Sequence, residues 1–176
     1  MRLLPYATGP RFVSIVATFA VAVSVLFRDE IVGPFVLPLR LLTARAVLVL
    51  IRGVGIDAFR EATALYHPGG FAYDLSRGCL GLIPAGFLIV GVLAYPSEGR
   101  RKLLALVVGV PVLFALNLVR LVHLFYLGVH DPDLFRPAHE LIWQALIVVV
   151  VFLLWLGATG HFASGIPRAR PCRDSP

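Results

Sequence analysis

Charged side chains are scarce in this chain of 176 residues. Asp, Glu, Lys and Arg make up 15% of it, whereas about a quarter is usual in a soluble domain. Hydrophobic residues make up 59%, and the mean hydropathy is +0.87. This composition excludes an ordinary soluble domain and predicts an integral membrane protein surrounded by the lipid bilayer.

Cysteine is equally scarce, because the chain has only Cys79 and Cys172. Two cysteines exclude a disulfide framework. Cys172 lies in a polar tail, residues 160–176, where an incidental exposed thiol is the simplest interpretation. Cofactor motifs are also missing, so we expect neither a cofactor nor a metal ion.

The net charge of +6 comes from a basic excess that is concentrated at the ends of apolar segments. A basic excess can indicate binding to nucleic acid. Here its placement indicates membrane topology instead, since short cytoplasmic loops are enriched in Lys and Arg. We therefore expect no nucleic-acid partner.

Four apolar stretches approach the length of about 17–25 residues that a membrane-spanning helix needs. The expected fold is all-α: a multi-pass integral membrane bundle that forms one domain, 1–176. A fifth apolar stretch, 35–51, carries Arg40 and Arg45, and we interpret it as part of an interfacial helix at about 35–54. The alternative is a fifth crossing, which would reverse the topology before it. The four expected spans are 12–27, 79–95, 103–127 and 139–157.

Three basic clusters fix the expected direction of the chain through the membrane. Placing all three in the cytoplasm gives four spans, with both termini inside and with 28–78 and 128–138 outside. Within the first outer segment, the alternation around Phe71 and Tyr73 predicts a short hairpin. The clusters are Arg2 with Arg11, then Arg100, Arg101 and Lys102, and finally Arg168, Arg170 and Arg173.

Three polar or reactive residues occupy the outer ends of three different spans. Cys79 opens the second span, Arg120 lies within the third, and His139 opens the fourth. Each lies 18 residues from the cytoplasmic edge of its span, which is about 27 Å along a helix. That distance is close to the thickness of the hydrocarbon core, so the three residues are expected at one level. The edges used are Ser97, Lys102 and Gly157.

These residue types suit thiol chemistry. A helix N-terminus or a neighbouring cation activates a thiol, and Arg77 and Arg120 are the candidate cations near Cys79. His139 can act as general base toward the thiol and general acid toward a leaving amine. Arg120 can hold a carbonyl or an oxyanion, and Asn117, one turn earlier, can orient it.

Other interpretations compete with this one. His123, three residues after Arg120, is a rival base, and Arg120 can instead reach the headgroups by snorkelling. Haem binding by His123 and His139 is another alternative. So is a non-catalytic membrane subunit, or a transporter component in which Arg120 binds an anion.

The order Cys, Asn-x-x-Arg and His, each at the outer end of a span, resembles the exosortase/archaeosortase family and is closest to its exosortase H subgroup. The resemblance covers roughly residues 69–156. It departs from the pattern of many members, which have a small or polar residue where this chain has Leu80, between Cys79 and Gly81. The similar segments are "GGFAYDLSRGCLG", "LAYPSEGRRKLLAL", "LNLVRLVHLFYLG" and "AHELIWQALI".

The resemblance implies a cysteine protease or transpeptidase of the cell membrane. It places Cys79 as nucleophile, with Arg120 and His139 as its catalytic partners and Gly81 in a supporting role. Its substrates would be proteins whose C-terminal sorting signal consists of a short motif, a transmembrane helix and a basic cluster. The active site would face the extracytoplasmic side.

The basic clusters alone generate one prediction: the two cysteines lie on opposite sides of the membrane. In spheroplasts of single-cysteine variants, a membrane-impermeant maleimide should spare Cys172 until the cells are permeabilised. It should reach Cys79 in sealed cells if the thiol is accessible. Labelling of Cys172 in sealed cells would overturn this topology.

Overall fold

The computed structural model describes residues 13, 14, 17, 20, 21, 24, 29–95 and 97–159, without the side chains of 29–35 and Arg77. The first expected span, 12–27, therefore falls largely outside the described residues. The cytoplasmic tail expected at 160–176, with Cys172, falls wholly outside them.

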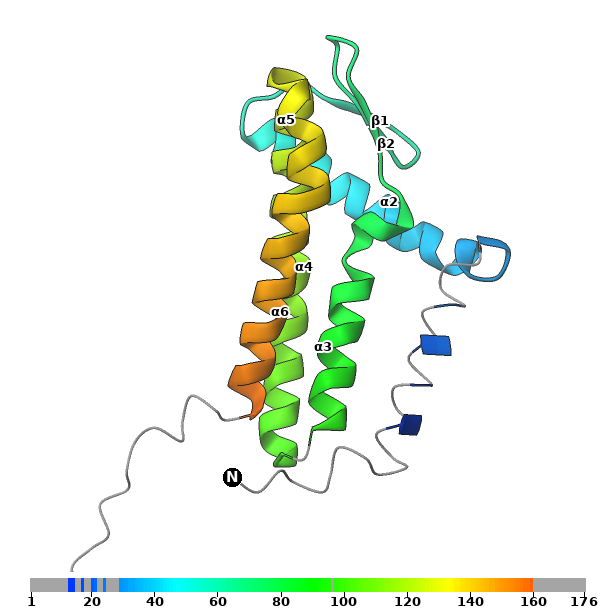
Figure 1. Cartoon of the computed structure of the whole chain (residues 1–176). Coiled ribbons are helices and arrows are strands. Elements are labelled where there is room, and N and C mark those ends of the chain that lie inside the picture. The colour runs from blue at the N-terminus through cyan, green and yellow to red at the C-terminus, as the bar shows by residue number, and fades with distance from the viewer. Residues whose placement is uncertain are drawn as a thin grey trace, which may run out of the picture.

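Three helices lie side by side and form a bundle (Figure 1). Among the described residues, two segments are long and apolar enough to cross a membrane, 99–130 and 132–159. The first is a single helix of 32 residues, about 48 Å long, which exceeds a hydrocarbon core of about 30 Å. The bundle helices are α3 (Leu82–Ala94), α4 (Gly99–His130) and α6 (Trp143–Thr159), and α6 is preceded by α5 (Pro132–Pro137) and a π-helical turn, η2 (Ala138–Ile142).

Small residues let the bundle helices approach closely. A Cβ added to Gly109 of α4 would lie 2.7 Å from Leu88 of α3. Gly91 of α3 lies against Trp155 of α6, whose indole N–H donates to the Gly91 carbonyl at 3.0 Å. Many apolar side chains on the outer faces of these helices are exposed, Phe87 and Phe152 among them, as contact with lipid requires.

A small sheet at one end of the bundle corrects the all-α expectation (Figure 1). Its three antiparallel strands are in the order β1-β2-β3, and β3 contains Tyr73. The turn between β2 and β3 closes where Gly70 adopts a positive φ of 94°, and the His67 N–H donates to the Phe71 carbonyl at 2.9 Å. The strands are β1 (Phe59–Glu61), β2 (Ala64–Tyr66) and β3 (Ala72–Asp74).

Helix α2 (Asp29–Gly53) lies across the same end of the bundle instead of alongside α3, α4 and α6 (Figure 1). The helix begins before the expected start at 35 and ends at Gly53, close to the expected end at 54, and its interfacial position stays a prediction. Val36, Ala44, Val47 and Ile51 form its buried face, at helical spacing.

The His130 end of α4 joins α2 and the sheet in one hydrophobic core, which we call the outer core because the sequence predicts that this end faces outward. Leu121 and Phe125 of α4 are fully buried there with Leu65 of β2. Gly128 permits the closest approach, because a Cβ at that position would lie 2.0 Å from the ring of Phe71. The end of α4 near His130 is therefore covered by α2 and the sheet.

The contacts of Arg40 explain why this arginine occurs in the apolar stretch of α2. Its Nε donates to the Leu75 carbonyl at 2.7 Å, and its Nη2 reaches Thr63 at 3.1 Å and an Asp74 carboxylate oxygen at 3.3 Å. Arg40 thereby fixes the segment that leads from β3 toward Cys79, whereas Arg45, on the same helix, is exposed.

Candidate active site

Cys79 lies in a short 3-10 turn, η1 (Arg77–Leu80), and not in the helix that follows. The segment expected as a span at 79–95 consists of η1 followed by α3, which begins at Leu82 and has 13 residues. By itself α3 is shorter than the roughly 17–25 residues that a membrane-spanning helix needs. Gly81 separates η1 from α3, because its φ of 73° is left-handed and interrupts the right-handed helix. Cys79 thus precedes the helix that it was expected to open, and its side chain is 4% exposed.

Asn117 of α4 holds the backbone at Cys79. Its Nδ2 donates to the Cys79 carbonyl at 2.7 Å, and both groups are buried. Gly81 makes this approach possible, because a Cβ there would lie 3.2 Å from Cβ and Cγ of Asn117. Asn117 was expected to orient Arg120, but its Oδ1 has no hydrogen-bond partner among the described residues.

Two hydroxyls that sequence reasoning missed lie beside the thiol. Tyr73 Oη and Ser76 Oγ are each 3.3 Å from Cys79 Sγ. Both residues stand just before Cys79, within the segment "GGFAYDLSRGCLG" that carries the resemblance, but sequence reasoning assigned neither of them a role. Burial raises the pKa of Tyr73 well above its usual value, Cys79 acts in the same direction, and the positive charge of Arg120 opposes both.

Arg120 is buried, at 6% exposure, one helical turn after Asn117. Its Nε has no hydrogen-bond partner, and no carboxylate among the described residues pairs with its guanidinium. Its charge nevertheless acts on Tyr73, which contacts the thiol. A buried guanidinium with an unused donor is suited to an anionic or carbonyl oxygen.

His139 lies in the π-helical turn η2, between α5 and α6. The span expected at 139–157 is thus a π-turn followed by a helix from Trp143 to Thr159. Its ring stacks on Phe135, with centroids 5.9 Å apart, and Phe135 makes an edge contact with Tyr73 at 5.7 Å. Among the described residues no hydrogen bond joins His139 to Cys79 or Arg120.

His123, the rival base, has a different partner. It accepts a hydrogen bond at Nδ1 from the Trp143 indole at 3.1 Å, and the two rings meet edge to face. His123 and His139 are therefore held by different aromatic residues. The side chain of Arg77, the other candidate cation, lies outside the described residues.

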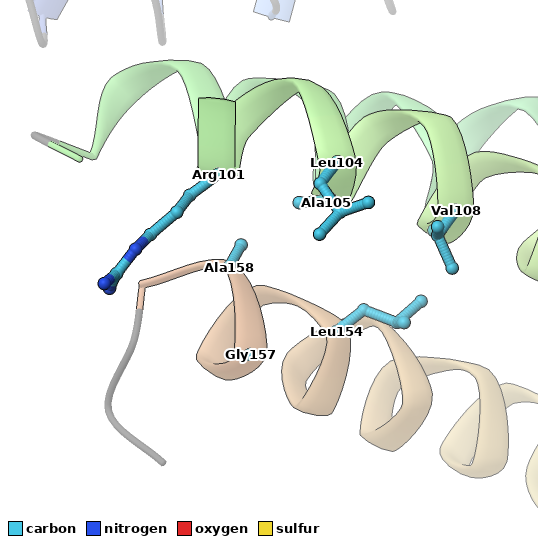
Figure 2. Close-up of a pocket in the computed structure, with 8 residues that line it drawn as sticks. Arg101, Leu104, Ala105, Val108, Leu154, Gly157 and Ala158 are labelled. Atoms are coloured by element: carbon cyan, nitrogen blue, oxygen red, sulfur yellow. The ribbon is translucent and has the colours of Figure 1, made fainter. Parts of the chain in front are cut away.

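A hydrogen bond joins Asn117 to Cys79, and Arg120 follows Asn117 by one helical turn. His139 lies farther from Cys79, beyond the rings of Tyr73 and Phe135. A separate apolar groove lies between α4 and α6 at the opposite end of these helices, with a volume of about 280 Å³ (Figure 2). Arg101 lines that groove, so it belongs to the basic end of α4 and not to the thiol site.

The fold and the site define a helical membrane protein with a thiol and a guanidinium buried where the bundle meets its outer core. The family model for the Transmembrane exosortase (Exosortase_EpsH) matches residues 3–159. The protein therefore belongs to the transmembrane exosortase family, which confirms the resemblance seen in its sequence. Searches of curated proteins and of solved structures found no match.

The geometry around Gly81 predicts that Gly81→Ala destabilises the protein more than Gly55→Ala. Both glycines have positive φ, which costs another residue about 1–2 kcal/mol. Only at Gly81 would the new methyl also meet Asn117, because nothing lies within 4 Å of a Cβ at Gly55. Thermal unfolding of the two variants in detergent measures the difference. Equal losses of stability would show that the contact with Asn117 is unimportant.

Proposed function

We propose that this protein is a cysteine transpeptidase or protease that cleaves C-terminal sorting signals through a thioester on Cys79. The observation that carries the proposal is a buried cysteine whose backbone carbonyl accepts a hydrogen bond from Asn117 of α4. Arg120, one turn after Asn117, is also buried and has an unused Nε donor. Membership in the exosortase family supports the same chemistry.

The first step is attack of the Cys79 sulfur on a substrate carbonyl. An S–C bond forms, and the carbonyl oxygen becomes an oxyanion. Arg120 is the group best suited to that oxygen, because its free Nε is buried and a charge-assisted hydrogen bond is strongest away from water. Asn117 Oδ1 is buried without a partner as well, so the amide of the substrate has a candidate acceptor.

His139 serves as the proton carrier of the reaction. It takes the proton of the thiol and returns it to the leaving amine when the C–N bond of the tetrahedral intermediate breaks. The thioester on Cys79 is then resolved by water or by an acceptor nucleophile. The π-helical turn supports this role, since such turns often occur at functional sites.

The membrane determines which bond reaches the thiol. A substrate helix that is held in the cytoplasm by a basic cluster emerges on the outer side at a fixed height. Cys79 precedes α3 at the end of the bundle opposite the basic residues 100–102, next to the outer core. The proposed site of cleavage is therefore the outer face of the cell membrane.

The experiment that tests this proposal is co-expression with a secreted protein that carries a matching tail. Cys79→Ala and Cys79→Ser should both accumulate in the membrane but lose processing. Serine fails because it lacks the acidity and nucleophilicity of the thiol. Near-normal processing by the serine variant would refute the assignment of the nucleophile.

Arg120→Lys should be almost as damaging as Arg120→Ala. Lysine keeps the positive charge but loses the planar set of donors. Loss of an oxyanion donor raises the barrier by about 2.7–4 kcal/mol, which is about a hundredfold to a thousandfold in rate. Initial rates of processing at equal membrane abundance give the comparison, and a lysine variant within a few-fold of wild type would show that Arg120 supplies charge alone.

His139→Ala should abolish processing, and His123→Ala should leave it nearly unchanged. His123 already accepts a hydrogen bond from Trp143, whereas His139 stacks on the ring that contacts Tyr73. His123→Ala is the matched control, because it removes an imidazole from the same end of the bundle. The reverse result would transfer the role of base to His123.

A further inference from the structure

Among the described residues, the thiol of Cys79 has two hydroxyl neighbours and no carboxylate neighbour. Tyr73 Oη approaches Sγ from β3, and Ser76 Oγ approaches it from the residue that precedes η1, each at 3.3 Å. A thiol is a weak donor and a weak acceptor, whereas hydroxyls are good donors. Two hydroxyls on one sulfur are therefore of greatest benefit when the sulfur is negatively charged.

We propose that Tyr73 and Ser76 are further catalytic residues, which donate hydrogen bonds to the Cys79 sulfur whenever it carries negative charge. This proposal rests on the proposed function of Cys79 as the nucleophile. It gives the hydroxyls a role that differs from those of Arg120, which faces the substrate oxygen, and His139, which carries the proton.

The surroundings of Tyr73 ensure that it acts as a donor. The residue is 9% exposed and packed against Phe135, so its phenol is shielded from water. Burial raises the pKa of Tyr73, and a neighbouring negative sulfur raises it further, so the phenol keeps its proton while the thiol loses one. The proton of the thiol then goes to His139, and Tyr73 stays neutral.

The hydroxyls affect both halves of the reaction. They favour the thiolate before attack, and they favour it again as the leaving group when an acceptor displaces it from the thioester. The sulfur of a thioester carries little negative charge, so the two hydrogen bonds are weakest in the intermediate. Stabilisation of the thiolate therefore promotes release of the product from Cys79 as well as attack on the substrate.

Among the described side chains, which do not include that of Arg77, three other charged or titratable groups are relevant to Cys79. Arg120 projects from α4, His139 lies on η2 beyond Phe135, and Arg40 of α2 is paired with Asp74. These groups are retained in every variant below, so a change in the pH dependence of the thiol can be assigned to the missing hydroxyls.

The test compares Tyr73→Phe and Ser76→Ala with Tyr66→Phe, in the full-length chain with Cys172→Ser. Tyr73→Phe removes one oxygen and keeps the ring against Phe135. Tyr66→Phe is the matched control, because Tyr66 lies on the neighbouring strand and stacks on Phe59. The rate at which iodoacetamide alkylates Cys79 is measured as a function of pH, and the midpoint of this curve is compared between variants. The absorbance of the thiolate, measured against Cys79→Ala as baseline, gives the same midpoint and does not require the reagent to reach the sulfur.

Tyr73→Phe should move the midpoint upward by about one pH unit, since a hydrogen bond to a charged group is lost. Ser76→Ala should move it in the same direction, and Tyr66→Phe should not move it. At neutral pH the rate of processing should fall about tenfold in Tyr73→Phe, without a change in substrate affinity. An unchanged midpoint in both Tyr73→Phe and Ser76→Ala would overturn the proposal.

The two proposals fail in different ways. If Cys79→Ala still processes substrate, the proposed function is wrong, and with it the catalytic role of both hydroxyls. If Cys79→Ala is inactive but the midpoint does not move, the nucleophile stands and the role of Tyr73 and Ser76 is refuted. A purely structural role for Tyr73 would lower the unfolding temperature and leave the midpoint in place.

Discussion

The hydrogen bond from the Asn117 amide to the Cys79 carbonyl joins the loop that carries the thiol to the helix that carries Arg120. Among the described side chains, no other hydrogen bond joins the 3-10 turn to α4. Because the bond is buried, loss of either partner would leave an unsatisfied polar group at a cost of about 1–3 kcal/mol. Gly81 gives α4 room to approach, and Arg40 fixes the preceding segment from the other side. Contacts from α4 and α2 thus position the segment that carries the sulfur.

The membrane sets the second constraint. Helix α4 is longer than the hydrocarbon core is thick, so its outer turns must be covered by protein or exposed to water. They are covered: Leu121 and Phe125 are buried against α2 and the sheet, and Gly128 meets Phe71. Arg120 is buried next to this covered end of α4. In the proposed function, this position would let its charge meet a substrate helix that emerges from the membrane.

Long apolar runs made much of the bundle predictable, because a helix is the simplest way to satisfy a backbone in lipid. The third expected span lies within α4. Cys79 and Arg120 could be predicted as a pair, because each lies the same number of residues from the cytoplasmic edge of its expected span. The environment of the sulfur was not predictable. Tyr73 lies on a strand of three residues and Ser76 before a 3-10 turn, and such short elements show no periodicity. The π-turn around His139 also has no sequence signature, so its stacking on Phe135 emerged only from the structure.

The covalent intermediate is the central claim of this account, and intact-protein mass spectrometry tests it most directly. The purified full-length protein is mixed with a tailed substrate and quenched in acid during turnover. The account predicts an adduct with the mass of the N-terminal substrate fragment, attached to Cys79 and released by hydroxylamine as a thioester would be. Cys79→Ala should show no adduct. Active processing without any adduct on Cys79, or an adduct on another residue, would contradict it.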